Sequence, residues 1–301
     1  MLYSATTPEQ KRRVFRERLA SGALITLPGA FNALAAQIIQ RKGCDGVYIS
    51  GHMIAADLGL PDIGLTTITE VASRAHQIAR MVDIPAIVDA DTGFGEPMNV
   101  ARSIQSLEDA GLAGCHIEDQ VNPKKCGHSE GVAVVDRGVA VRRITAAVSA
   151  RRDQNFAIIA RTDARNVNGL ADAIERARAY EEAGADVIFA EALSGAAEYE
   201  AMRASVTVPL MVNLNEFGRG LPLTRQQLID LGVNVAIYPM TLMRLAMGAM
   251  ERGIDDILAT GSQHASLDQM QTRDELYDLL GYDEYSAFDN RVFAAGGDAE
   301  T

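Results

Sequence analysis

The chain has 301 residues, 48% of them hydrophobic, and a net charge of −12 that is spread along the sequence. This length and hydrophobic content suit one large domain, or a barrel with a small appendage. The acidic charge argues against a nucleic-acid or anionic-membrane partner, so an anionic substrate would need a local cluster of donors or a metal.

Short runs rich in β-branched residues alternate with amphipathic helical patterns along most of the chain. A helix is predicted over 8–20, followed by eight strands over 23–27, 46–50, 86–91, 114–119, 157–162, 187–192, 210–215 and 235–239. Such alternation is typical of an α/β protein with a (β/α)₈ barrel. No GxGxxG motif follows the first strand, which weakens the dinucleotide-binding alternative.

The domain organisation follows from these elements. We predict that residues 1–254 form the barrel with its N-terminal helix. Residues 255–301 are predicted to be a C-terminal helical extension, which is too short for a core of its own and should pack on the barrel or on a neighbouring subunit.

The N-terminal segment and the cysteines indicate the cellular compartment. Charged residues stand where a signal peptide would have its apolar segment, and no apolar run approaches the roughly 18 residues of a membrane span. We therefore expect a cytoplasmic protein. The cysteines are odd in number and irregularly spaced, which indicates neither a disulfide framework nor a zinc motif: Cys44, Cys115 and Cys126.

Polar side chains recur at the carboxyl ends of six consecutive predicted strands, where barrel enzymes gather their catalytic groups. Because side chains alternate along a strand, two residues of each end share a face. The pairs are Tyr48 and Ser50, Asp89 and Asp91, His116 and Glu118, Arg161 and Asp163, Phe189 and Glu191, and Asn213 and Asn215.

Three of these residues, Asp89, Asp91 and Glu118, are carboxylates on adjacent strands, and no lysine is expected beside them. Close carboxylates repel one another unless a cation intervenes, and an all-oxygen ligand set favours Mg²⁺ or Mn²⁺. Acid–base work by a carboxylate pair and helix capping by Asp91 are the alternatives. No lysine ends a strand, so a Schiff-base aldolase is not expected and carbanion chemistry would need the metal.

The loop after the fourth strand carries the segment KKCGH, residues 124–128, which holds two of the four lysines. Two lysines beside Cys126 favour a reactive thiol that can act as an acid, base or nucleophile. Gly127 and Gly131 would let the loop fold over a ligand and exclude water. The alternative is an ordinary solvated loop in which Cys126 only packs.

Five segments together resemble the isocitrate lyase and phosphoenolpyruvate mutase superfamily, and their order and spacing agree over nearly the whole chain. They are DADTGFG (89–95), HIEDQ (116–120), KKCGH (124–128), ARTDA (160–164) and MQTRDELY (270–277). The resemblance implies a barrel with a swapped helix, dependence on Mg²⁺, and a homotetramer built as a dimer of dimers.

The resemblance also implies roles for single residues. Asp89 and Asp91 resemble the metal site, with Glu118 acting through water. Contacts to a small di- or tricarboxylate substrate are implied for Ser50, Gly51, His52, Gly127, Arg161, Glu191, Asn213, Leu214, Asn215, Arg244 and Arg273, the last supplied by the tail of the same or a neighbouring subunit. The catalytic residues assigned on this basis are Cys126 as proton donor, Lys124 and His128 tuning its loop, and Tyr48, assisted by Arg161, as acceptor of the substrate hydroxyl proton.

Within the superfamily, KKCGH is similar to the lyase signature, and Phe189 and Ile237 resemble the apolar specificity pocket of the branch that cleaves 2-methylisocitrate to pyruvate and succinate. The chain departs from that branch at His52, Val132, Ala190 and Asn215. A 2,3-dimethylmalate lyase and an oxaloacetate decarboxylase therefore stay open as alternatives. Carbon–phosphorus bond chemistry and a catalytically inactive barrel are weaker ones, because the cysteine and the carboxylates are present.

Overall fold

The computed structural model describes residues 4–127, 131–217 and 223–296. The chain divides into two compact units, one of Thr6–Met243 and one that contains the residues from Arg244 onward. The division falls within helix α11 (Thr241–Thr260), somewhat before the boundary at residue 254 that we expect from the sequence. Among the described residues no helix combines the length and hydropathy that a membrane crossing requires.

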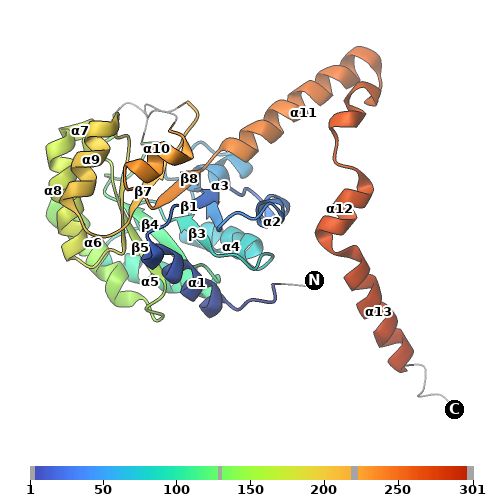
Figure 1. Ribbon diagram of the computed structural model, residues 1–301, viewed down its shortest axis with the longest axis horizontal. Helices are drawn as coiled ribbons and strands as arrows, with labels where there is room; N and C mark the ends of the chain where they lie inside the picture. The colour runs from blue at the N-terminus through green and yellow to red at the C-terminus, as the bar shows by residue number, and fades with distance from the viewer. Residues whose placement is uncertain (1–3, 128–130, 218–222, 297–301) are drawn as a thin grey trace. The chain divides into compact units, whose positions relative to one another are not determined.

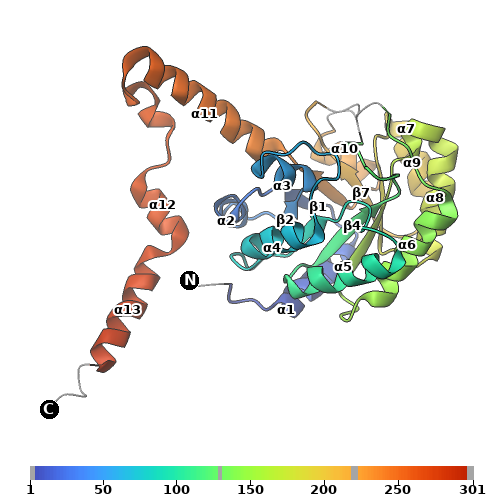
Figure 2. The same cartoon turned by 180° about the vertical axis from the view of Figure 1, so that it is seen from behind.

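The larger unit is a parallel eight-stranded barrel surrounded by helices, as Figures 1 and 2 show. Its neighbour order is β1-β8-β7-β6-β5-β4-β3-β2, and a single bridge between Gly29 and Tyr48 joins β1 to β2. The (β/α)₈ prediction is thereby confirmed, with strand ends that differ from the expected ones by at most two residues. The strands are β1 (Ile25–Pro28), β2 (Val47–Ile49), β3 (Ala86–Asp89), β4 (Gly114–Glu118), β5 (Ala157–Thr162), β6 (Val187–Ala190), β7 (Leu210–Asn213) and β8 (Val235–Tyr238).

Helix α1 (Pro8–Ser21) precedes the barrel, as predicted, and begins with a capping box between Thr7 and Gln10. The remaining helices of this unit cover the strands on the outside. They are α2 (Ala33–Arg41), α3 (Gly51–Asp57), α4 (Ile68–Ala79), α5 (Pro97–Asp109), α6 (Arg137–Ala150), α7 (Ala164–Asn168), α8 (Leu170–Glu182), α9 (Ala196–Ser205) and α10 (Arg225–Asp230).

The apolar core has two layers, because successive side chains on each strand point to opposite faces. The outer layer lies between strands and helices. The inner layer fills the barrel with side chains such as Leu27, Ile159 and Phe189, and Phe15 and Leu19 of α1 belong to it. Helix α1 therefore closes the amino-terminal end of the barrel, which leaves the carboxyl ends of the strands for chemistry.

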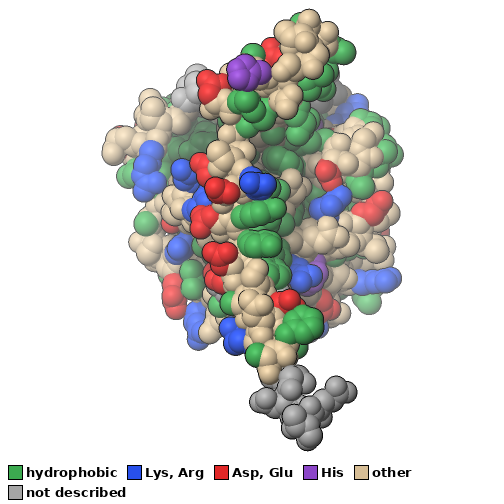
Figure 3. Space-filling model, turned by 90° about the vertical axis from the view of Figure 1, so that its right-hand side faces the viewer, with side chains coloured by type: hydrophobic (Ala, Val, Ile, Leu, Met, Phe, Trp, Pro, Cys, Tyr) green, Lys and Arg blue, Asp and Glu red, His purple; other side chains and the backbone are tan. Residues whose placement is uncertain are grey.

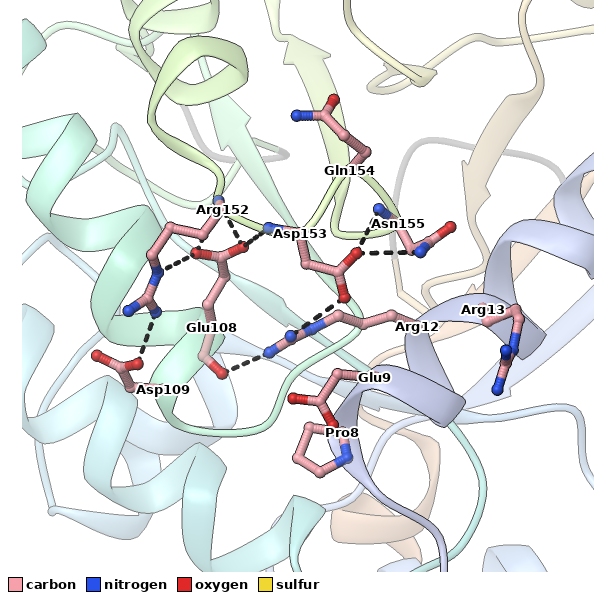
Figure 4. A pocket seen from close by; sticks show the side chains of 10 residues that line it. All are labelled: Pro8, Glu9, Arg12, Arg13, Glu108, Asp109, Arg152, Asp153, Gln154 and Asn155. Carbon is pink, nitrogen blue, oxygen red and sulfur yellow. Dashed lines mark hydrogen bonds and ion pairs between the residues drawn. The ribbon is translucent and has the colours of Figure 1, made fainter.

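A groove of about 730 Å³ lies at the amino-terminal end, between α1, the end of α5 and the segment that leads into β5. Figure 4 shows that most of its charged side chains pair with one another. Arg152 contacts Glu108 at 3.0 Å and Asp109 at 2.6 Å. Because these charges are satisfied internally, the groove is a structural junction and carries no indication of catalysis.

Arg12 at this junction gives a prediction about stability. Its buried guanidinium donates to the carbonyl oxygens of Leu112 (2.9 Å) and Glu108 (2.5 Å) and pairs with Asp153 (3.3 Å). Arg12→Ala leaves the two carbonyl oxygens and the Asp153 carboxylate without this partner, so we expect a loss of about 2–4 kcal/mol in the free energy of unfolding. Chemical denaturation measures it. Arg13→Ala, on the exposed side of the same turn, is the control and should cost at most about 0.5 kcal/mol; equal losses in the two variants would contradict the assignment.

The smaller unit contains α11, a 3₁₀ helix η1 (His264–Gln269), α12 (Arg273–Leu280) and α13 (Tyr282–Gly296). Its helices carry large apolar side chains with high exposed fractions, among them Leu245 at 65%, Leu258 at 80% and Phe293 at 75%. Figure 3 shows such side chains gathered along these helices. A contiguous apolar surface of this kind is typical of a segment that packs against a protein partner.

Candidate active site

A cavity of about 40 Å³ lies at the carboxyl ends of the barrel strands. Its lining brings together most of the predicted site residues, which come from the ends of β2 to β7 and from the loop after β4. They are Tyr48, Ser50, His52, Asp89, Glu118, Lys124, Cys126, Gly127, Arg161, Glu191, Asn213 and Asn215. Eight of the twelve strand-end residues expected from alternation therefore line one small space, and the four that do not are Asp91, His116, Asp163 and Phe189.

Asp89 and Asp91 follow one another across the end of β3, and both are buried. Asp89 accepts hydrogen bonds from the backbone N–H of Asp91 at 3.0 Å and of Gly51 at 3.3 Å. Asp91 has a φ of 46°, so the chain leaves the strand there in a conformation that L-residues rarely adopt. A Cβ at Gly51 would lie 3.0 Å from Asp89 and 3.2 Å from Asp91, so glycine keeps the space beside the carboxylates open.

A lysine lies among the carboxylates, contrary to our expectation from the sequence. The Nζ atom of Lys124 is 2.6 Å from Oδ1 of Asp91 and 2.5 Å from Oδ1 of Asp62. Burial opposes the charged ammonium, but the surrounding carboxylates outweigh it and raise the pKa of Lys124 well above its usual value. The expectation failed because the loop after β4 folds back over β3, which strand-end positions do not reveal.

The pKa values of the buried carboxylates shift in different directions. Burial raises the pKa of Asp91 and, strongly, that of Glu118, whereas His116, Lys124 and Arg161 together overcome the burial of Asp89 and lower its pKa. Oε1 of Glu118 is buried and has no hydrogen-bond partner among the described residues. Three buried carboxylates, an orphaned acceptor and the space at Gly51 fit a hard cation bound by oxygen ligands.

Arg161 on β5 is the central cation of the other half of the site. It forms a bidentate pair with Asp163 (3.0 and 2.9 Å) and lies 3.3 Å from Glu118 and 3.5 Å from Glu191. Its guanidinium also stacks over the Phe189 ring at 5.2 Å. Asp163 occupies the Nε and Nη2 fork of Arg161, so the guanidinium is fixed in position, and a fixed positive charge at this place suits a substrate carboxylate.

A buried network that the sequence analysis missed supports this arginine. Asp119, adjacent to Glu118, accepts hydrogen bonds from the backbone N–H of Asp163 (2.9 Å), from the Thr162 hydroxyl (2.7 Å) and from the Tyr180 hydroxyl (2.8 Å), and it pairs with Arg176 at 3.2 Å. These contacts fix the backbone that carries Asp163 and so the orientation of Arg161. The HIEDQ motif contains Asp119, but side-chain alternation assigns it to the outer face.

Tyr48 and His116 form a buried pair inside the mouth, with Oη and Nε2 2.8 Å apart. Burial lowers the pKa of His116 to about 4, so its imidazole is neutral at physiological pH. Burial and the charge of Asp89 raise the pKa of Tyr48 well above its usual value. In this state Tyr48 is therefore a protonated phenol that is hydrogen-bonded to Nε2 of His116, and the tautomer of the neutral imidazole sets which of the two groups donates.

The loop after β4 places Cys126 at the cavity. The side-chain amide of Gln120 holds the loop at Lys125, because it donates to the carbonyl oxygen of that residue and accepts from its backbone N–H, each at 2.9 Å. At Gly127 a Cβ would lie 2.4 Å from Asp163 and 2.5 Å from Arg161, so only glycine lets the loop approach this closely. The predicted residue His128 lies outside the described residues.

Several predicted residues do not line the cavity. Phe189 and Ile237 belong to the inner core beneath it, and Leu214 packs against the outer layer. Arg244 and Arg273 belong to the smaller unit, which is described by itself. In turn, the cavity includes residues that the sequence analysis missed, namely Asp62, Lys125, Pro239 and Met240. Asp62 comes from the loop after α3, and no local motif marks it.

Comparisons with known proteins agree with this geometry. A family model described as phosphoenolpyruvate phosphomutase matches residues 15–258. A curated relative, "Probable 2-methylisocitrate lyase 2" of Corynebacterium glutamicum, is 55% identical over 98% of this chain and 96% of its own length. A crystal structure of 2,3-dimethylmalate lyase, described as a PEP mutase/isocitrate lyase superfamily member, aligns with a TM-score of 0.86 at 31% identity, over 95% of this chain and 96% of that one.

A further solved structure, phosphonopyruvate hydrolase in complex with oxalate and Mg²⁺, aligns with a TM-score of 0.85 at 30% identity, over 93% of this chain and 98% of that one. The resemblance deduced from the five sequence segments is thus confirmed. With the barrel, the carboxylate cluster and matches over nearly its whole length, this chain belongs to the phosphoenolpyruvate mutase and isocitrate lyase superfamily.

Proposed function

We propose that this chain is a Mg²⁺-dependent carbon–carbon lyase that cleaves 2-methylisocitrate into pyruvate and succinate. The observation that carries the proposal is the single cavity that gathers Asp89, Glu118, Arg161 and Cys126, in a chain 55% identical to a probable 2-methylisocitrate lyase. Carboxylates for a metal, a fixed guanidinium for a substrate carboxylate and a thiol for proton transfer are what such a cleavage requires.

Asp89 and Asp91 are the residues that would hold the metal, with Glu118 beside them, and the solved phosphonopyruvate hydrolase complex with Mg²⁺ supports this choice of ion. A bound Mg²⁺ would act as a Lewis acid, favouring ionisation of the substrate hydroxyl and stabilising negative charge on the pyruvate half. Lys124 pairs with Oδ1 of Asp91, so its ammonium and a bound metal would compete for that carboxylate or share it.

The protein side chains supply binding and proton transfer. Arg161 binds a substrate carboxylate, while Ser50, Gly51, His52, Glu191, Asn213 and Asn215 surround the remaining polar groups. Tyr48 relays the hydroxyl proton: its phenol takes up that proton while its own proton passes along the hydrogen bond to His116. The carbon–carbon bond then breaks, its electron pair goes to the succinate half, and Cys126 protonates that carbon.

The size of the cavity adds a requirement for substrate entry. A volume of about 40 Å³ holds little more than a water molecule, whereas ligand pockets usually measure roughly 300–1,000 Å³. This volume is smaller than a tricarboxylate needs, and the loop that carries Lys124 and Cys126 forms part of the lining. We infer that the structure represents a closed state, and that loop opening precedes each turnover.

The preference for an extra methyl group tests the proposed substrate. Phe189 and Ile237 form the apolar core directly beneath the site, and we expect the methyl group to use their surface once the loop opens. The ratio of kcat/KM for 2-methylisocitrate to that for isocitrate should then correspond to about 1–3 kcal/mol. Pyruvate or glyoxylate release measures both rates with Mg²⁺ present. Equal values, or a preference for isocitrate, would contradict the methyl pocket.

A second candidate function is cleavage of 2,3-dimethylmalate, because a lyase for that compound aligns over 95% of this chain. The same panel should therefore include 2,3-dimethylmalate and oxaloacetate, with pyruvate detection throughout. Faster turnover of either compound than of 2-methylisocitrate would overturn the proposed substrate while leaving the proposed chemistry in place.

We also propose that the smaller unit packs against further copies of this chain in a homotetramer built as a dimer of dimers, with Arg273 reaching a substrate. The exposed apolar side chains of α11 and α13 support this proposal. Light scattering coupled to size-exclusion chromatography should then give a molecular mass four times the chain mass of 32.3 kDa. A mass equal to that of one chain would contradict it.

A further inference from the structure

Three side chains with different ligand chemistry meet at the mouth of the barrel. They are His52 from the first turn of α3, Asp62 from the loop after that helix, and Cys126 from the loop after β4. One nitrogen, oxygen or sulfur atom of each lies within 4.8 Å of the others, and all three residues are half-buried. We propose that His52, Asp62 and Cys126 form a second metal site, which takes a thiophilic divalent cation such as Zn²⁺.

The donor set distinguishes this site from the carboxylate cluster. Imidazole and thiolate are preferred by Zn²⁺, whereas Mg²⁺ prefers oxygen ligands throughout. Asp89, Asp91 and Glu118 offer only oxygen ligands, so we expect Mg²⁺ to bind there and Zn²⁺ to bind at His52, Asp62 and Cys126. Three protein ligands leave a fourth position for water, as in zinc sites that are open to solvent.

The distances are close to those that a tetrahedral ion requires. Zinc bonds of about 2.0–2.3 Å place neighbouring ligand atoms roughly 3.3–3.8 Å apart. Nδ1 of His52 and Oδ2 of Asp62 are already 3.7 Å apart. The remaining separations, up to 4.8 Å, close with a side-chain adjustment of roughly 1 Å. The His52 side chain is 39% exposed, so such an adjustment meets little resistance.

The meeting of all three donor atoms favours a metal over a catalytic relay. In a relay of cysteine, histidine and carboxylate, the imidazole lies between its partners and uses a different nitrogen for each. Here the three atoms surround one point. The other oxygen of Asp62 pairs with Lys124, which anchors the carboxylate with Oδ2 directed toward His52. On binding, the Cys126 thiol loses its proton to solvent and becomes a thiolate ligand.

Occupation of this site would withdraw the Cys126 thiol from the proposed chemistry and hold its loop against α3. The experiment therefore measures binding directly, so that its outcome does not depend on the proposed reaction. The full-length protein in saturating Mg²⁺ is titrated with Co²⁺, a spectroscopic substitute for Zn²⁺, and then with Zn²⁺ in a calorimeter. We expect one ion per chain with a sulfur-to-cobalt charge-transfer band, and displacement of Co²⁺ by Zn²⁺.

Matched variants locate the ion. Cys126→Ser should abolish the charge-transfer band, and His52→Ala should weaken Zn²⁺ binding about tenfold or more. Cys44→Ser and His264→Ala remove the same types of side chain elsewhere in the protein, so they should change neither the charge-transfer band nor the Zn²⁺ affinity. Circular dichroism verifies that each variant is folded, and His52→Asn repeats the test with a side chain of similar size. Absence of the band in the unmodified protein, unchanged Zn²⁺ affinity in both His52 variants, or displacement of the ion by Mg²⁺ would overturn the proposal.

Discussion

Replacing Cys126 with serine should lower kcat by about 10²–10⁴-fold, the usual effect of losing a general acid. Serine preserves size and hydrogen bonding, but its hydroxyl is a far weaker acid than a thiol. Cys126 lines the cavity that also contains Asp89 and Arg161, so its proton is within the site where the succinate carbon would form. Substrate and Mg²⁺ should still bind, because most of their proposed contacts lie at the ends of the strands or at α3, outside the loop that carries Cys126.

The control for this prediction is Cys44→Ser, which alters a thiol that is packed against the outer layer. Steady-state kinetics and calorimetric substrate binding should be measured for both variants. A Cys126→Ser enzyme with more than half of the original kcat would show that the thiol only packs the loop. A variant that neither turns over nor binds substrate would instead indicate that Cys126 is needed to form the site.

The barrel itself could be predicted from the sequence because each strand is marked by residues that are neighbours in the chain. Each strand is a short apolar run followed by polar residues, and inward and outward side chains alternate. The predicted strands extend too far where the chain begins its catalytic loops. Asp91 and Ala192 have φ values of 46° and 60°, so the backbone turns away there although the residue types still suit a strand.

The parts of the site that could not be predicted from the sequence are the contacts that loops make when they fold over the ends of the strands. Lys124 and Asp62 are 62 residues apart, yet their side chains share an ion pair over β3. Asp119 faces outward by alternation, and its role is visible only when Thr162, Asp163 and Tyr180 surround its carboxylate. Spacing along the chain predicts which strand end a residue occupies, but it carries no information on contacts that a loop makes across strands.

Chelation of divalent cations should abolish turnover, and Mg²⁺ or Mn²⁺ should restore it, without any need for Zn²⁺. The three proposed ligands are all carboxylates, and burial raises the pKa of Asp91 and Glu118 when no ion is bound. A hard cation would favour their charged forms, so binding and ionisation support one another. EDTA already saturated with Mg²⁺ is the control, because it adds the chelator without removing the ion.

The ammonium of Lys124 is an alternative to the metal as the cation of this site, because it already neutralises part of the charge of Asp91. If that ammonium were a sufficient cation, the chelated enzyme would keep its activity, and full turnover after exhaustive chelation would contradict a metal-dependent reaction. Asp91→Asn should weaken Mg²⁺ binding by about 10–100-fold or more in calorimetry. Asp283→Asn, on the exposed first turn of α13, should leave it unchanged. An ammonium is a point charge with three donors, whereas Mg²⁺ holds several oxygen ligands in an octahedron, so only the ion can bind protein carboxylates and a substrate hydroxyl together.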